Sequence, residues 1–197
     1  MTEVSMTRRG RVTPEREAEL YEVVLDLLGE VGYDGLTMDA VAARTRSSKA
    51  TLYRQWGGKV ELVVAAMKQT RPVDIEQVDT GSLRGDFDAL LANVDDAAMA
   101  RTSSLMRGLA MAMHHHRDLG RVFREQIVEP DLRQFRRVLE RAVERGEIRA
   151  DNPALDHAVH LLLGAFVARG LLDGQPPTGG FLREYVRAVL LPVLVDA

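Results

Sequence analysis

The chain has 197 residues, enough for one medium-sized domain or two small ones. Hydrophobic residues make up 46% of it and charged residues 28%, which excludes a disordered or collagen-like chain. The absence of cysteine excludes disulfides, thiolate nucleophiles and cysteine-ligated metal centres, and it fits a reducing cytoplasm. A net charge of −3 argues against a protein that coats nucleic acid over its whole surface, but it allows a local basic patch.

The sequence predicts no targeting or membrane-spanning segment. Arg8 and Arg9 are followed by a charged stretch, 14–17, instead of an apolar one, so a twin-arginine signal is rejected. The most apolar stretch, 155–172, is interrupted by two histidines and Arg169 and is short for a bilayer. We therefore expect a cytoplasmic protein that has no membrane partner.

Hydrophobic spacing predicts an all-α fold, because apolar residues recur at helical intervals and no strand-like alternation is sustained. The first helix begins after Thr13, a residue type that favours helix N-caps, and has Pro14 in its first turn. Gly32 is expected to end it. Three further helices precede the boundary at Arg71-Pro72, and they are predicted over 38–44, 49–55 and 59–70.

The rest of the chain predicts a larger helical body. Five helices are expected there, about nine in all: 83–99, 102–116, 118–145 with a possible kink at Pro130, 153–172 and 181–194. The predicted organisation is a flexible basic arm over 1–12, a helix-turn-helix domain over 13–58 and a helical bundle over 59–197.

Two short helices joined by a tight turn in the window 37–59 are typical of a helix-turn-helix, whose second helix can enter the major groove of DNA. Val41, Leu52 and Trp56 supply apolar contacts that fix the angle between the helices. The stretch 44–59 holds five cations and no carboxylate, although the chain is acidic overall. This distribution predicts a phosphate-binding surface.

The exposed residues of this window divide by the chemistry they offer to DNA. Hydroxyls and cations suit phosphate oxygens, whereas residues at the start of the second helix are placed to read base edges. We expect contacts to DNA from Thr37, Arg46, Ser48, Lys49, Ala50, Thr51, Tyr53, Arg54 and Lys59. Arg8, Arg9 and Arg11 could extend into the minor groove, with plain solvation as the alternative. A purely structural role also stays open for Tyr53.

Residues 13–62 resemble the DNA-binding domain of the tetracycline-repressor (TetR) family of bacterial transcription regulators. The resemblance lies in Gly32-Tyr33-Asp34-Gly35-Leu36-Thr37, Val41-Ala42, Ser48-Lys49-Ala50-Thr51-Leu52-Tyr53, Trp56 and Lys59. Three positions depart from the family pattern: Arg46 replaces the turn glycine, Ser47 replaces an apolar residue, and Gly58 replaces a capping serine. Arg46 and Ser47 predict a turn that is extended or angled differently.

The last two predicted helices suggest self-association, because the first of them is apolar on nearly every side. The resemblance implies that these helices form a four-helix interface in a homodimer, which would read a palindromic site. The expected interface residues are Leu162, Phe166, Arg169, Tyr185 and Val189. The alternative is that both helices close the core of a monomer.

The resemblance also implies that a small-molecule effector binds in the C-terminal helical bundle. The helix that begins at Lys59 would join the DNA-binding domain to this bundle. Methionine and phenylalanine side chains suit an adaptable pocket, although a methionine stripe is more often ordinary core. The expected pocket residues are Met67, Met106, Met113, Phe123 and Phe166.

We expect neither a metal nor a cofactor. Three consecutive histidines, His114 to His116, point in different directions on a helix, and His157 with His160 lacks a third ligand. The predicted function is a ligand-responsive transcriptional regulator, most simply a repressor, that binds double-stranded DNA. A helical-bundle enzyme and a partner-binding module without DNA binding are the alternatives, and no recognisable catalytic motif favours the former.

Overall fold

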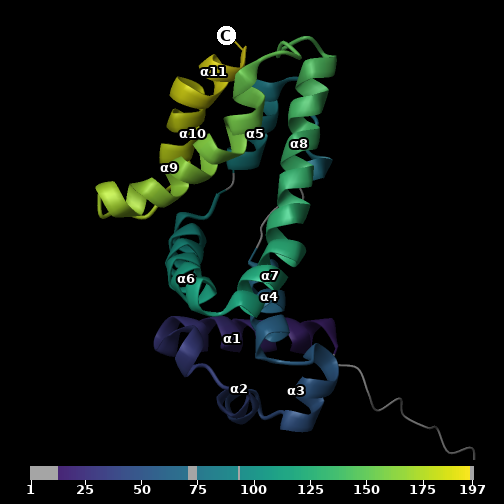
Figure 1. The fold of residues 1–197 in the computed structure, drawn as a ribbon, viewed down its shortest axis with the longest axis vertical. Helices are drawn as coiled ribbons and strands as arrows, with labels where there is room; N and C mark the ends of the chain where they lie inside the picture. Colours follow the sequence, from purple (N-terminus) through teal and green to yellow (C-terminus); the bar gives the residue numbers. More distant parts are fainter. Residues whose placement is uncertain (1–12, 71–74, 93, 196–197) are drawn as a thin grey trace, which may run out of the picture. The chain divides into compact units, whose positions relative to one another are not determined.

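The computed structural model describes residues 13–70, 75–92 and 94–195, and across these residues it contains helices and no strand (Figure 1). The all-α prediction is confirmed. The chain divides into two compact units, Met1–Gln69 and Thr70–Ala197. This division falls one helix later than the sequence suggested, because the helix that begins at Lys59 packs with the first unit. Arg8, Arg9 and Arg11 lie outside the described residues.

The first unit consists of α1 (Pro14–Gly35), α2 (Met38–Thr45), α3 (Lys49–Trp56) and α4 (Lys59–Gln69). The side chain of Thr13 caps α1, as predicted, by accepting a hydrogen bond from the backbone N–H of Arg16 at 3.3 Å. The regular helix is interrupted at Gly32, where the sequence predicted its end: Gly32 has a non-helical φ of 71° and ψ of 177°, and α1 resumes beyond this kink as far as Gly35. Apolar faces of α1 and α4 form the core of this unit, with Leu20, Val24, Leu25, Leu28, Leu62, Val63, Val64 and Met67 all buried.

The second unit is built from helices and short irregular turns. Two turns are π-helical, η2 and η4, and each joins two α-helices into a longer rod. In chain order the elements are η1 (Ile75–Gln77), α5 (Leu83–Ala92), α6 (Asp96–His115), α7 (Arg117–Phe123), η2 (Arg124–Val128), α8 (Glu129–Glu144), η3 (Pro153–His157), α9 (Ala158–Leu172), α10 (Gly179–Tyr185), η4 (Val186–Leu190) and α11 (Leu191–Val195).

Two predicted helices of the body differ in the structure. Helix 83–99 stops at Ala92, because Asp95 begins a new helix by accepting hydrogen bonds from the backbone N–H groups of Ala97 and Ala98 at 2.9 and 3.2 Å. The irregularity expected at Pro130 is the π-helical turn just before it. Proline has no N–H to donate and crowds the preceding turn, which interrupts the regular helical ladder.

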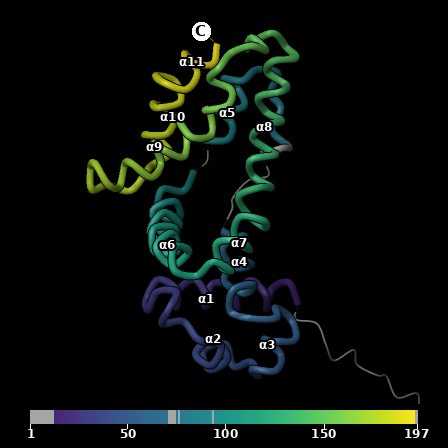
Figure 2. The backbone as a smooth tube through the Cα atoms, viewed as in Figure 1, coloured from purple at the N-terminus to yellow at the C-terminus, as the bar shows by residue number. Residues whose placement is uncertain are grey.

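The core of the second unit joins segments that are distant in sequence. Figure 2 shows α5 beside α10 and α11, with α8 alongside. Asn152 fastens the start of η3 to α11, because its side-chain amide donates to the carbonyls of Val193 and Leu194 at 3.1 and 2.9 Å. The buried cluster consists of Leu83, Phe87, Phe135, Val138, Leu139, Ala142, Ile148, Ala158, Val186, Leu190, Leu191 and Leu194.

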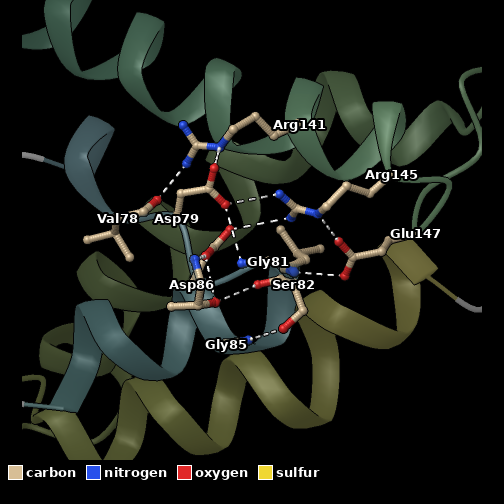
Figure 3. Close-up of polar contacts among 11 residues, drawn as sticks. Val78, Asp79, Gly81, Ser82, Gly85, Asp86, Arg141, Arg145 and Glu147 are labelled. Carbon is tan, nitrogen blue, oxygen red and sulfur yellow. Dashed lines mark hydrogen bonds and ion pairs between the residues drawn. The ribbon is translucent and has the colours of Figure 1, made fainter.

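A polar cluster ties the segment before α5 to the end of α8 (Figure 3). The Asp86 carboxylate is fully buried and accepts hydrogen bonds from the backbone N–H and the hydroxyl of Thr80 at 2.7 and 2.8 Å. Arg145 lies 3.4 Å from Asp86 and 2.5 Å from Glu147, whose second oxygen accepts from the N–H of Leu83 at 2.7 Å. Arg141 donates to the carbonyl of Val78 at 2.6 Å. We call Val78, Asp79, Thr80, Asp86, Arg141, Arg145 and Glu147 the Asp86 cluster.

Candidate nucleic-acid interface

Helix α3 presents a mixed cationic and small-residue face to solvent. Ser48 caps the helix by accepting from the N–H of Thr51 at 3.1 Å, and the two hydroxyls lie 2.8 Å apart. Leu52 is fully buried and Trp56 nearly so, which turns the opposite side of the helix outward. That outward side carries the exposed residues Lys49, Ala50, Tyr53 and Arg54.

Trp56 fixes α3 against α1 through a buried chain of hydrogen bonds. Its indole N–H donates to the Tyr21 hydroxyl at 3.1 Å, and Tyr21 donates to the Glu17 carboxylate at 2.5 Å. The Tyr21 and Trp56 rings meet edge to face, with centroids 6.0 Å apart. Burial, with a further contribution from Glu17, raises the pKa of Tyr21 to about 12. The orientation of the exposed α3 face therefore depends on these three side chains.

The turn between α2 and α3 is tight, as the helix-turn-helix prediction requires, and helix α2 is not extended through Arg46 and Ser47. Arg46 adopts the left-handed conformation, with φ 52° and ψ 35°, which glycine usually occupies. The N–H of Ser47 donates to the carbonyl of Ala42 at 3.0 Å, and that of Arg46 donates to Ala43 at 3.4 Å. This pattern is a Schellman motif, so Arg46 takes the place of glycine without opening the turn.

Two of the five cations in the window have carboxylate partners elsewhere in the first unit. Lys49 pairs with Asp39 at 2.9 Å, and Arg44 pairs with Glu30 at 2.9 Å. The hydrogen bond that Lys49 donates to Asp39 raises the pKa of Lys49. A count of charges along residues 44–59 missed these partners, because both acids precede residue 44 in the sequence. Arg46 and Arg54 are exposed and form no ion pair within the described part of the chain.

Lys59 begins α4 and is half-buried. Its ammonium group lies 4.1 Å from the centroid of the Tyr33 ring, a cation–π contact. Burial lowers the pKa of Lys59, and the charge of Asp34 opposes that shift. Thr37 caps α2 by accepting from the N–H of Ala40 at 3.1 Å, and its side chain is exposed. All nine residues expected to contact DNA thus lie in the first unit, at or between the starts of α2 and α4.

In the second unit, a cavity of about 670 Å³ lies between α6, α7 and η2. Met106, Met113 and Phe123, three of the five expected pocket residues, line this cavity. Met67 is instead buried in α4 of the first unit, and Phe166 lies on α9. The positions of methionine and phenylalanine in the sequence could not predict which of these residues line the cavity and which lie elsewhere.

Helix α9 carries an apolar surface that the second unit leaves exposed. Leu163 is 53% exposed, Val167 63% and Leu171 82%, and these three residues recur on one side of the helix. The expected interface residues Leu162, Phe166, Arg169, Tyr185 and Val189 are all half-buried. Arg169 pairs with Asp173 at 3.3 Å and stacks on the Phe181 ring at 4.2 Å.

The segment Pro153–Leu172 is long and apolar enough to cross a membrane by length and composition, with a mean hydropathy of 1.3. Only 11% of its most apolar window is buried. Its length therefore reaches the range of a membrane span, but length and composition alone do not overturn the prediction that the chain has no membrane-spanning segment. In the ranges 13–70, 75–92 and 94–195, no group of three or more histidine and acidic side chains is arranged to hold a metal ion.

Two family profiles match the chain. Residues 20–66 match the bacterial regulatory proteins of the tetR family, and residues 77–189 match the tetracyclin repressor-like C-terminal domain. The chain belongs to the TetR family. It is a DNA-binding transcriptional regulator of this family and not an enzyme.

Similar proteins agree with the TetR-family membership over nearly the whole chain. An uncharacterised HTH-type transcriptional regulator of Mycobacterium tuberculosis is 37% identical over 180 residues, which cover 91% of this chain and 88% of the relative. The DNA-binding transcriptional repressor TetR of Mycobacteroides abscessus is 35% identical over 190 residues, which cover 96% and 97%.

Solved structures of TetR-family regulators have the same fold. A TetR-family transcription regulator that is 28% identical superposes with a TM-score of 0.60 and covers 89% of this chain and 97% of its own. A TetR transcriptional regulator from Agrobacterium tumefaciens, 22% identical, gives a TM-score of 0.58 with coverages of 90% and 93%. The second likeness concerns the fold alone.

Proposed function

We propose that this TetR-family protein is a cytoplasmic repressor that binds a palindromic operator as a homodimer and leaves it when a small-molecule effector binds. The observation that carries the proposal is the exposed face of α3, where Lys49, Ala50, Tyr53 and Arg54 surround a buried anchor at Leu52 and Trp56. A helix of this size and charge fits the major groove of B-DNA.

The contacts divide between positioning and reading. Arg54, Tyr53 and Lys59 offer charge or a hydroxyl to phosphates, which sets the register of the protein on the duplex. Lys49 and Ala50 occupy the first turn of α3, where recognition helices approach base edges, and Ala50 offers a methyl group to thymine. Thr37, Arg46, Ser48 and Thr51 complete the same surface. Lys49 must exchange its Asp39 partner for DNA.

A second copy of the chain is the partner that we propose for α9. Leu163, Val167 and Leu171 form a continuous apolar stripe, and Gly164 beside it has open space around its Cα. Such a stripe is unfavourable in water, whereas a two-fold partner would bury both copies at once. The dimer would carry two α3 helices, which accounts for the palindrome in the proposal.

The test is a selection of DNA from a random pool by the full chain, followed by gel-shift titration of the selected site. We expect an inverted repeat, with binding that weakens steeply as the salt concentration rises. Arg54→Gln should weaken binding to all sequences and lower the salt slope. Lys49→Ala should instead relax the preference at one base pair in each half-site.

Arg133→Gln, which removes an exposed arginine from α8 of the other unit, is the matched control and should leave DNA binding unchanged. A protein that selects no sequence, or whose binding does not respond to salt, would contradict the proposal. Retained binding to a single half-site by a monomer would contradict the dimeric part alone.

A further inference from the structure

The cavity of the second unit is lined by both apolar and cationic side chains. Its volume of about 670 Å³ is within the range of small-molecule sites. Met106, Ala110 and Met113 follow one face of α6 at helical spacing, and Phe123 of α7 and Val128 of η2 add apolar side chains to the lining. Methionine side chains adapt their shape to an apolar ligand.

The polar side chains that line this cavity are one histidine and three arginines. They are His114, Arg117, Arg121 and Arg124, and none of the ten lining residues is acidic. Arg121 is engaged, because it pairs with Glu125 at 3.2 Å and lies 3.8 Å from Asp118. Arg117 and Arg124 are exposed and form no ion pair or hydrogen bond through their side chains in the part of the chain that the structure describes.

The π-helical turn η2 gives the cavity its second wall. It places Arg124 and Val128, its first and last residues, on the lining while Ile127 is buried in the unit. A π-helical turn is rare and is frequently found at functional sites. The wall thus supplies one unpaired guanidinium and one apolar side chain to the same space.

We propose that this cavity binds an organic anion, a carboxylate or a phosphate ester with an apolar body, and that this anion is the effector of the proposed repressor. The apolar body lies on Met106, Met113 and Phe123. Arg117 and Arg124 bind the anionic group, since the planar guanidinium suits carboxylate and phosphate oxygens. Binding of the anion in this cavity does not depend on the proposed function. Only its role as the effector of the repressor rests on that function.

Titration calorimetry on the full chain tests the charge preference with four probes of equal chain length. These are octanoate, octyl phosphate, 1-octanol and octyltrimethylammonium, each kept below its aggregation concentration. We expect one or both anions to bind at least tenfold more tightly than the alcohol, and the cation to bind most weakly. The preferred anion distinguishes a carboxylate effector from a phosphate ester. Equal binding of anion and cation, or no binding of any probe, overturns the proposal.

Variants locate the site. Arg117→Gln and Arg124→Gln should each weaken anion binding about tenfold and leave octanol binding unchanged, whereas Arg133→Gln on α8 should change neither. Unchanged anion binding in both cavity variants overturns the assignment to this cavity. If a variant fails to fold, by circular dichroism, the probe preference of the unaltered chain still decides the class of ligand.

The effector role is separated by adding the bound anion to a gel shift with the selected operator. Release of the operator by the anion, and not by octanol at the same concentration, supports the role. Anion binding without any change in operator affinity overturns the effector role and leaves the cavity assignment standing. Operator binding without the anion is measured first, so failure of the proposed function is recognised independently.

Discussion

The guanidinium of Arg145 lies 3.4 Å from the fully buried carboxylate of Asp86, and this contact joins the end of α8 to the start of α5. A buried carboxylate is tolerated only when it is paired and hydrogen-bonded, and Asp86 also accepts two hydrogen bonds from Thr80. The contact fixes the segment that precedes α5 at the start of the second unit. Together with the hydrogen bonds from Arg141 to Val78 and from the N–H of Leu83 to Glu147, it holds residues 78–86 against the end of α8.

Asp86→Ala is expected to lower the free energy of unfolding of the second unit by about 2–4 kcal/mol, because it removes the buried acceptor of the Thr80 N–H and one of the carboxylate partners of Arg145. Urea unfolding followed by far-UV circular dichroism measures the change. The matched control is Asp88→Ala, which removes an exposed carboxylate paired with Arg187 at 2.8 Å and should cost at most about 1 kcal/mol. Equal losses for both variants would show that burial of Asp86 contributes nothing.

Arg46→Gly is expected to stabilise the first unit by about 0.5–1 kcal/mol and to weaken operator binding. Glycine adopts the left-handed conformation of residue 46 without strain, although it also loosens the unfolded chain. Arg46→Ala removes the same cation and keeps the strain, so it should weaken binding without the gain in stability. Thermal unfolding and gel shifts on both variants separate the two effects, and a glycine variant no more stable than the alanine variant would contradict the strain.

Asp39→Asn is expected to strengthen operator binding severalfold at low salt, because Lys49 no longer has to leave a carboxylate before it reaches DNA. Fluorescence anisotropy with a labelled operator measures the affinity. Glu19→Gln, which removes a carboxylate from an exposed pair on α1, controls for the change in net charge. If both variants gain equally, the Lys49–Asp39 pair has no specific role.

The pKa of Tyr21 predicts an alkaline weakness of the first unit. Its folded-state pKa is about 12, above the ordinary value of 10.0, so the folded state favours the neutral phenol. The stabilisation is complete below pH 10 and is lost as the pH rises through about 12. Free energies of unfolding should therefore fall more steeply over this interval in the unaltered chain than in Tyr21→Phe. Tyr53→Phe, at an exposed position, should behave like the unaltered chain.

Val167→Arg is expected to raise the dimer dissociation constant at least a hundredfold, because each copy would place a charge in the apolar stripe of its partner. Sedimentation velocity over a range of concentrations measures the constant. Met111→Arg adds the same charge at a position on α6 that is 67% exposed, and it should have no effect on association. A monomeric unaltered chain, or an unaffected Val167→Arg dimer, would contradict the proposed partner.

Local sequence patterns predicted the elements of the first unit well, because capping residues such as Thr13, Thr37 and Ser48 act within one helical turn. They also predicted the exposed side of α3, since Leu52 and Trp56 mark the buried side. They could not predict that Asp39 and Glu30 would neutralise Lys49 and Arg44, because those pairs depend on how separate helices cross.

The body was harder to predict for the same reason. Met67 and Phe166 are of the same residue types as the residues that line the cavity. Only the packing of α4 and α9 shows that they lie elsewhere than Met106, Met113 and Phe123. The π-helical turn before Pro130 produces no periodic pattern of residues that could be recognised in the sequence. The helix cap at Asp95 is a single acidic residue in a stretch that otherwise favours a continuous helix. Tertiary packing decides each of these features.

The apolar stripe on α9 also has a consequence for the abundance of the protein in the cell. If the chain forms the dimer proposed above, a subunit without its partner exposes Leu163, Val167 and Leu171, and quality-control proteases and chaperones bind exposed apolar segments of this kind. Unpaired subunits would therefore be degraded faster than paired ones. At low expression, the steady-state amount of the protein would then increase more than in proportion to its rate of synthesis. A small change in the rate of synthesis would therefore give a larger relative change in the occupancy of the operator.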